Sequence, residues 1–168
     1  MVNERTEDLV PDVDRQFQRL QVLEGEVLGM SEDFALSQYE VDIYGCLVED
    51  LDPMHNEPDW EHARREWGGP IAIGTQVLAM APAFLKQVGL PVADPMVTFD
   101  VTRVSRVRFV SPLRVDEQAR AEVRLLAVRE RASGWEVRTA IAVHPCEEGR
   151  PFMHAEIDSI FVRGMVEK

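Results

Sequence analysis

One long apolar segment, followed by four strand-like segments, constrains the fold of this chain more than any other feature. Residues 73–88 are apolar on nearly every side of a helical projection, which is typical of a buried helix. Pro82 should kink this helix, and Gly89 followed by Pro91 should end it. The later segments are rich in β-branched residues and span 96–110, 118–128, 135–143 and 152–163. A lone buried helix before consecutive strands predicts an α+β fold, in which a curved antiparallel sheet wraps around the helix.

The length of 168 residues fits one domain that buries roughly 70% of the surface exposed by the unfolded chain. We expect an acidic, partly mobile extension over residues 1–24, with a short helix within 13–23, and a single domain over 25–168. The first residues lack the apolar core of a signal peptide. The longest stretch without a charged residue, 68–85, contains Gly, Pro, Gln and Thr and is not a membrane span. These features predict a cytoplasmic protein.

The net charge of −12 argues against nucleic acid as a partner, because neutralising phosphates requires a basic face. The charge is unevenly distributed. Residues 49–66 hold seven acids against two arginines, whereas residues 103–131 hold eight arginines against four acids. Arginine forks suit phosphate, so a small phosphorylated ligand is compatible with the second segment, although solvated strand faces are the simpler interpretation. Cys46 and Cys146 are too few for a disulfide framework, and we expect both to be reduced.

Two carboxylates and an imidazole lie close together around a proline turn. The pattern from Ser37 to Glu40 is a capping box that opens a helix, and Pro53 prevents this helix from continuing. Asp50 therefore lies at the helix exit and His55 just beyond the turn. A carboxylate and a neutral imidazole held together can orient a water molecule and move its proton.

Plainer interpretations of the same turn stay open. Asp50 and His55 could be solvated side chains at a helix end. Together with Asp52 they could bind a divalent cation, but no further ligand-spaced motif supports this, and we expect neither a metal nor a cofactor. A short helix is expected over residues 59–66. His144 and His154 lie in strand-like segments and are expected to be structural.

Three segments resemble the family of MaoC-like dehydratases and (R)-specific enoyl-CoA hydratases. Asp-Leu-Asp-Pro-Met-His at residues 50–55 resembles the family motif Asp-x-Asn-Pro-x-His. Residues 69–74 resemble the segment that leads into the family's central helix, and residues 106–113 resemble its later arginine–aromatic–proline strand. Pro82 and this last segment are most similar to the nodulation-protein-N branch. The resemblance covers about residues 25–163.

The resemblance implies a hot-dog fold and a dimer, or a dimer of dimers, with active sites near the subunit interface. It implies a hydro-lyase acting on an acyl-CoA or acyl-carrier-protein thioester. Asp50 and His55 match the catalytic pair, and Gly74 matches the glycine whose amide binds the thioester oxygen. Substrate binding is assigned in the same way to Asp52, Pro53, Ile73, Arg106 and Arg108.

The chain departs from the family pattern at three positions near the motif. Glu49 stands where the family usually has glycine, Asp52 replaces asparagine, and Ile73 replaces the histidine before Gly74. The first departure concerns the turn before Asp50, the second adds a negative charge, and the third makes the helix entrance more apolar. Two alternatives therefore stay beside the hydro-lyase: a hot-dog protein that binds an acyl thioester without turnover, and an acyl-CoA thioesterase.

Overall fold

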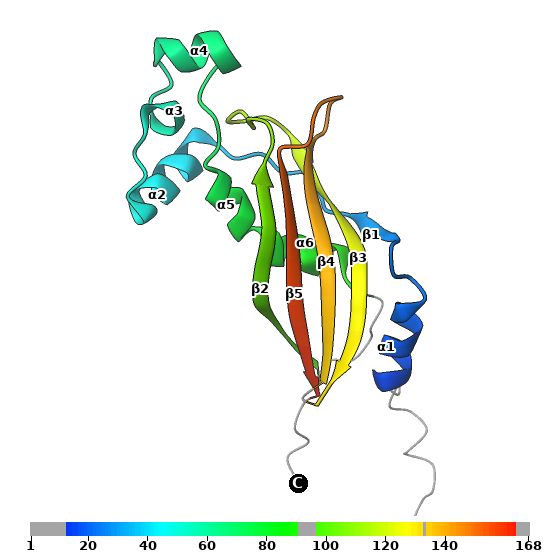
Figure 1. The fold of residues 1–168 in the computed structure, drawn as a ribbon. Coiled ribbons are helices and arrows are strands. Elements are labelled where there is room, and N and C mark those ends of the chain that lie inside the picture. Colours follow the sequence, from blue (N-terminus) through cyan, green and yellow to red (C-terminus); the bar gives the residue numbers. More distant parts are fainter. Residues whose placement is uncertain (1–12, 91–96, 133, 164–168) are drawn as a thin grey trace, which may run out of the picture.

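A five-stranded antiparallel sheet forms the centre of the computed structural model, which describes residues 13–90, 97–132 and 134–163 (Figure 1). The strands follow the spatial order β1-β3-β4-β5-β2, so that β1 and β2 are the two edges. Their bounds are β1 Val27–Met30, β2 Val97–Phe109, β3 Ala119–Arg131, β4 Gly134–Pro145 and β5 Met153–Arg163. Every neighbouring pair is antiparallel, which confirms the predicted sheet.

The long strands match the four strand-like segments, with differences at their ends. β3 continues to Arg131 instead of ending at Val128, because it pairs with β4 up to the contact between Arg131 and Gly134. Phe34 forms an isolated antiparallel bridge with Ala119. The first strand, β1, lies earlier in the chain and pairs with β3.

The described residues also form six helices: α1 Val13–Gln21, α2 Gln38–Val48, α3 Pro53–Asn56, α4 Glu61–Trp67, α5 Gly74–Ala79 and α6 Ala81–Val88. Figure 1 shows α5 and α6 on the side of the sheet turned away from the viewer. Helices α2, α3 and α4 form an arm that projects beyond one end of the sheet, whereas α1 lies beside β3 at the opposite end (Figure 1). None of the helices in the described ranges has the length and apolar composition needed to cross a membrane.

The predicted long helix is divided into α5 and α6, which meet at Met80. Pro82 lies in the first turn of α6, where its missing N–H needs no partner within the helix. The face of these helices that packs on the sheet is buried at Val77, Ala81 and Phe84. The helical segment is not buried on every side, however, because Ala79 on the opposite face is exposed in the single chain.

Two apolar clusters hold the helices against one face of the sheet. The larger cluster lies under α5 and α6 and includes Val77, Phe84 and Ile141. The smaller cluster lies under α1, where Phe17 stacks on Trp135 with ring centroids 5.3 Å apart. Burying such side chains contributes about 1.5–3 kcal/mol each. Within the predicted extension, therefore, α1 packs on the sheet, and residues 1–12 lie outside the described residues.

Candidate functional site

The first helix of the arm, α2, is capped at both ends as its sequence requires. The hydroxyl and amide of Ser37 donate to the carboxylate of Glu40, and these bonds hold the pKa of Glu40 below its usual value. At the other end, Glu49 adopts the left-handed conformation with φ 59° and ψ 30°. The amide of Asp50 then donates to the Gly45 carbonyl over 2.9 Å, which is the long bond of a Schellman motif. This turn directs Asp50 out of the helix.

The left-handed conformation of Glu49 is one that glycine adopts without strain, whereas other residues pay about 1–2 kcal/mol for it. We therefore expect Glu49→Gly to raise the free energy of unfolding by about 1 kcal/mol, measured from urea midpoints. Glu57→Gly is the matched control, because exposed Glu57 ends α3 at a negative φ of −116°. This variant should lower the free energy of unfolding, since glycine relieves no strain there and makes the unfolded chain more flexible. A lower midpoint for Glu49→Gly than for the wild type would contradict the strain at this turn.

Helix α3 is a single turn that positions His55. Asp52 caps it, because its carboxylate accepts the amide of Met54 over 3.0 Å, and Pro53 occupies its first turn. The amide of His55 donates to the Asp52 carbonyl over 2.9 Å. Asp52 therefore does the capping work that asparagine would do equally well.

The imidazole of His55 is almost fully buried, with 9% of its surface exposed. Its Nδ1 lies 2.7 Å from the carbonyl oxygen of Ile71. A carbonyl oxygen only accepts, so Nδ1 carries the proton and Nε2 of the neutral ring keeps a free lone pair. A further hydrogen bond, from the Ile71 amide to the Met54 carbonyl, holds Ile71 against α3.

A cleft of about 440 Å³ brings four of the sequence-predicted residues together. Asp50 from the end of α2, His55 from α3, and Ile73 and Gly74 at the entrance to α5 all border it. Its other walls are mostly apolar or aromatic and include Trp67, Ile71, Phe109, Val110 and Phe152. The cleft thus combines an acid–base pair with a surface suited to an apolar substrate group.

Gly74 is the first residue of α5, and the N-cap residue before it, Ile73, provides no side-chain cap. The first amides of a helix have no acceptor within it and lie at the positive end of the helix dipole. A Cβ at Gly74 would lie 2.8 Å from the ring of Phe109. Only glycine therefore allows Phe109 to pack directly on this end of the helix, at the edge of the cleft.

No family model matches the chain, and no curated protein matches it in sequence. Solved structures nevertheless share its architecture. A MaoC-like dehydratase from Rhodospirillum rubrum is 19% identical, with a TM-score of 0.66 over 95% of this chain and 98% of its own. The (R)-hydratase from A. caviae, involved in PHA biosynthesis, is 21% identical, with a TM-score of 0.64 over 80% and 96%. A monoamine oxidase regulatory protein from Archaeoglobus is 22% identical, with a TM-score of 0.66 over 84% and 91%.

The chain has the hot-dog fold. The central helix of this fold corresponds to α5 and α6 here, and the curved sheet to β1–β5. At these sequence identities the likeness concerns the fold. The chemistry must therefore be argued from the residues of the cleft.

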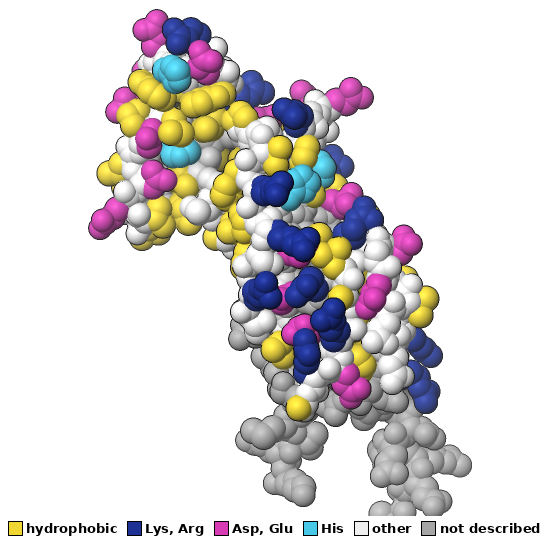
Figure 2. All heavy atoms as spheres, viewed as in Figure 1, with side chains coloured by type: hydrophobic (Ala, Val, Ile, Leu, Met, Phe, Trp, Pro, Cys, Tyr) yellow, Lys and Arg dark blue, Asp and Glu magenta, His cyan; other side chains and the backbone are white. Residues whose placement is uncertain are grey.

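Arg106 and Arg108 lie on the hot-dog sheet but outside this cleft. A bulge between Ser105 and Arg108 interrupts the pairing of β2 with β5, and Arg106 takes the left-handed conformation there. Its guanidinium lies 3.3 Å from the carboxylate of Glu156. Together with His154 it borders a separate groove on the face away from α5 and α6. Figure 2 shows lysine and arginine side chains in a column along this face, as solvated strand faces predict.

The described residues include no group of three or more His, Cys, Asp or Glu side chains arranged to hold a metal ion. Asp52 bonds to its own helix and does not border the cleft, and neither does Pro53. The interpretation of Asp50, Asp52 and His55 as cation ligands therefore has no geometric support.

The aromatic wall of the cleft was not anticipated from the sequence. Phe109 lies in the segment that resembles the family's arginine–aromatic–proline strand, so a signal for it was present. Trp67 ends α4, and Phe152 precedes β5. Their convergence depends on how the arm meets the ends of β2 and β5, which no local pattern specifies.

Proposed function

We propose that this chain is a hydro-lyase of the MaoC-like family that adds water to, or removes it from, the 2,3 position of an acyl thioester. In substrate terms it is an (R)-specific enoyl-CoA hydratase or the reverse 3-hydroxyacyl-thioester dehydratase. One observation carries the proposal: Asp50, His55 and Gly74, from three separate elements, border a single cleft. The shared fold of a MaoC-like dehydratase and an (R)-hydratase supports it.

His55 and Asp50 supply the acid–base chemistry. In hydration, the water oxygen forms a bond to C3 while the free Nε2 of His55 takes one of its protons. The electron pair of the C2–C3 double bond moves toward the thioester carbonyl, and C2 then gains a proton. Asp50 orients the water molecule or relays the proton to C2. The hydrogen bond to the Ile71 carbonyl keeps the buried ring of His55 oriented for this exchange.

Negative charge develops on the thioester oxygen during this step, and in this proposal the amide of Gly74 stabilises it. Gly74 is the first residue of α5 and borders the cleft. One donor of this kind typically contributes about 10²–10³ in rate. General acid–base catalysis contributes roughly 10²–10⁴. Both terms are therefore required for an efficient reaction.

The acyl group lies against the apolar wall in this proposal. Of the residues assigned to substrate binding by resemblance, Ile73 borders the cleft, whereas Asp52, Pro53, Arg106 and Arg108 do not. Ile73 replaces a polar imidazole with an aliphatic side chain. This favours an apolar acyl chain over a hydroxylated or charged one.

The direct test is to mix purified protein with trans-2-enoyl-CoA thioesters of short, medium and branched chains and follow the enoyl-thioester absorbance. We expect the absorbance to fall and the product to be the (R)-3-hydroxyacyl thioester. A thiol reagent in parallel samples detects free CoA, which would indicate hydrolysis instead. Saturable binding of these thioesters without any product would favour the non-catalytic alternative. Absence of turnover with every chain would contradict the proposed reaction.

We further propose that the chain acts as a homodimer or a dimer of dimers. The outer face of α2 presents an apolar stripe at every fourth residue, and Figure 2 shows hydrophobic side chains gathered on the arm. The stripe consists of Tyr39, Ile43 and Leu47, and exposed Leu51 follows in the next turn. Monomers rarely leave a contiguous apolar patch uncovered. Sedimentation at micromolar concentration should give at least twice the 19.1 kDa mass of one chain.

A further inference from the structure

The turn that carries Asp50 is tied together by the side chain of Asn56. The Nδ2 group of Asn56 donates to the Asp50 carbonyl over 3.2 Å and to the Asp52 carbonyl over 3.4 Å. Between these two carbonyls lies Leu51, whose side chain is 61% exposed. The turn therefore buries no side chain of its own at its tip. Its shape depends on backbone hydrogen bonds and on this carboxamide.

The orientation of the Asn56 carboxamide is determined by its neighbours. Both neighbouring groups are carbonyl oxygens, which only accept, so the NH₂ side must face them. The Oδ1 atom is buried and has no hydrogen-bond partner among the described residues. Leaving a buried acceptor unpaired costs about 1–3 kcal/mol. The Asn56 side chain is thus held in place by the hydrogen bonds that its NH₂ group donates.

Helix α2 leaves room for this arrangement at Gly45. A Cβ at Gly45 would lie 2.7 Å from the Asp50 carbonyl oxygen and 3.0 Å from Asn56 Oδ1. Glycine inside a helix costs about 1 kcal/mol relative to alanine, and here it permits the turn to fold back against the bare backbone. Since the Gly45 carbonyl also accepts the amide of Asp50, the backbone of Asp50 is held at both its N–H and its C=O.

The ring and the carbonyl of His55 are held by other groups. Its ring donates to the Ile71 carbonyl, and its own carbonyl accepts a bond of 2.7 Å from Nε2 of Gln38. A change at Asn56 should therefore displace Asp50 while His55 stays in place. The two halves of the acid–base pair can be perturbed separately.

We propose that Asn56 is a positioning residue that fixes the Asp50 carboxylate relative to His55 and the substrate. The proposal rests on the hydro-lyase function proposed above. Asn56 does not border the cleft, so it acts through the backbone of Asp50. A misplacement of about 1 Å in a catalytic group can cost about 10²-fold in rate. The loss should appear in kcat, because the apolar wall that binds the acyl chain is untouched.

The test compares Asn56→Ala and Asn56→Asp with Gln21→Ala and Gln21→Glu. Gln21 is a matched control, because its Nε2 also donates to a backbone carbonyl, that of Val128, over 3.1 Å. Gln21 lies at the end of α1, which Figure 1 shows at the far end of the sheet from the arm. For the Asn56 variants we expect kcat to fall about 10–100-fold with KM within about threefold. For the Gln21 variants we expect kcat within about twofold of wild type.

A wild-type kcat in both Asn56 variants would overturn the proposal, and so would equal losses in the Asn56 and Gln21 pairs. Gly45→Ala provides an independent perturbation, since its Cβ would push the Asp50 carbonyl. It should lower kcat in the same way, with KM preserved. We call the hydrogen bonds from Asn56 to the Asp50 and Asp52 carbonyls the clamp. An unchanged kcat in Gly45→Ala would likewise contradict the clamp.

Amide hydrogen exchange separates this proposal from the proposed reaction. If wild-type protein turns over no enoyl thioester, the reaction is wrong, but the clamp still makes a prediction. In Asn56→Ala the amide of Asp50 should exchange about tenfold faster, whereas the amide of His55, which donates to the Asp52 carbonyl, should change by less than about threefold. Unchanged exchange at Asp50 would overturn the clamp in active or inactive protein.

Discussion

Replacing His55 by alanine should lower kcat for enoyl-thioester hydration by about 10³-fold, and Asp50→Asn should lower it by about 10²–10³-fold. His55→Ala removes the free Nε2 lone pair that takes the proton of water. Asp50→Asn keeps the size of the side chain but removes its charge and its ability to relay a proton. The apolar wall of the cleft is unchanged in both variants, so KM should change much less than kcat. Steady-state kinetics on the best thioester of the substrate panel gives both parameters.

His144→Ala is the matched control for His55→Ala. His144 borders the groove on the opposite face of the sheet, together with Arg106 and Arg124. Its loss should leave kcat within about twofold. The kcat of the double variant Asp50→Asn/His55→Ala should be at most about tenfold lower than that of His55→Ala, because residues that act as a unit show non-additive losses. If both single variants hydrate the substrate at the wild-type rate, the catalytic assignment is wrong.

The turn that carries Asp50 and His55 was predictable because it depends on short-range rules. The turn at Glu49 and the proline at residue 53 act within a few residues of Asp50 and His55, and the capping box at Ser37 sets where the preceding helix begins. Each rule determines where the chain leaves one helix and enters the next. The order of elements was predictable for a similar reason, since one apolar helix before several strand-like segments has few ways to bury its surface.

The arginines show where local reasoning fails. Alternation along β2 would assign a face to each residue, but two irregularities, after Val101 and after Ser105, shift the register against β5. A shift of one residue moves a side chain to the other face of a sheet. Arg106 contacts Glu156 and Arg108 pairs with His154, so both arginines lie on the face away from the cleft, while Phe109 reaches it. A bulge has no clear mark in the sequence when its left-handed residue is an arginine.

The bond from His55 to the Ile71 carbonyl is also beyond local prediction, because it joins residues 16 positions apart. Because the carbonyl oxygen only accepts, the bond indicates that Nδ1 carries the proton in the neutral ring. The sequence indicated that His55 could act as a base, but only the fold shows that Nε2 keeps the lone pair.

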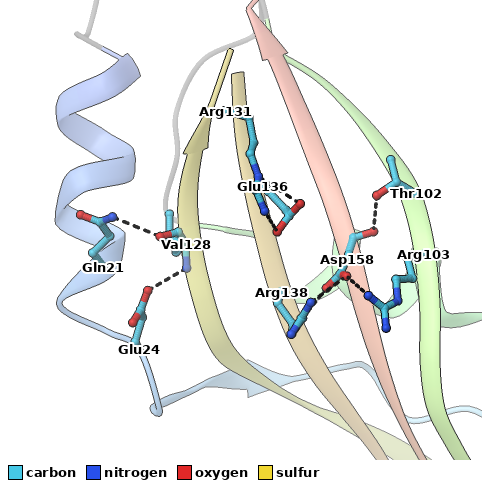
Figure 3. A network of polar contacts seen from close by, with 9 residues as sticks. All are labelled: Gln21, Glu24, Thr102, Arg103, Val128, Arg131, Glu136, Arg138 and Asp158. Atoms are coloured by element: carbon cyan, nitrogen blue, oxygen red, sulfur yellow. Dashed lines mark hydrogen bonds and ion pairs between the residues drawn. The ribbon is translucent and has the colours of Figure 1, made fainter. Parts of the chain in front are cut away.

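Replacing Asp158 by alanine should lower the free energy of unfolding by about 3 kcal/mol at neutral pH. Asp158 lies on β5 and is 4% exposed. Its two carboxylate oxygens accept from the guanidinium of Arg138 on β4 over 2.6 and 3.0 Å, and Arg103 on β2 lies 4.0 Å away (Figure 3). The carboxylate thus joins three neighbouring strands. Its removal leaves the partly buried Arg138 without its partner, which is the costly way to break an ion pair.

Glu136→Ala is the matched control for this variant. Glu136 also receives two bonds from an arginine of the neighbouring strand, Arg131, over 2.9 and 3.3 Å (Figure 3). The side chain of Arg131 is 47% exposed, however, so water screens this pair. Such a pair contributes about 1 kcal/mol or less. Urea midpoints should therefore fall clearly for Asp158→Ala and only slightly for Glu136→Ala, and equal shifts would show that burial of the pair does not determine its strength.

The dependence on pH provides the second half of the test. The bonds from Arg138 hold the pKa of Asp158 below its ordinary value, against the opposing effect of burial. A carboxyl group with a lowered folded-state pKa stabilises the protein fully above its unfolded-state pKa of about 3.9, and this contribution is lost as the pH falls through the folded-state value. The difference in stability between wild type and Asp158→Ala should therefore be constant from pH 7 down to about pH 5 and should shrink below about pH 4. A difference that stayed constant on acidification would mean that Asp158 stabilises the sheet by packing, and that its charge contributes nothing.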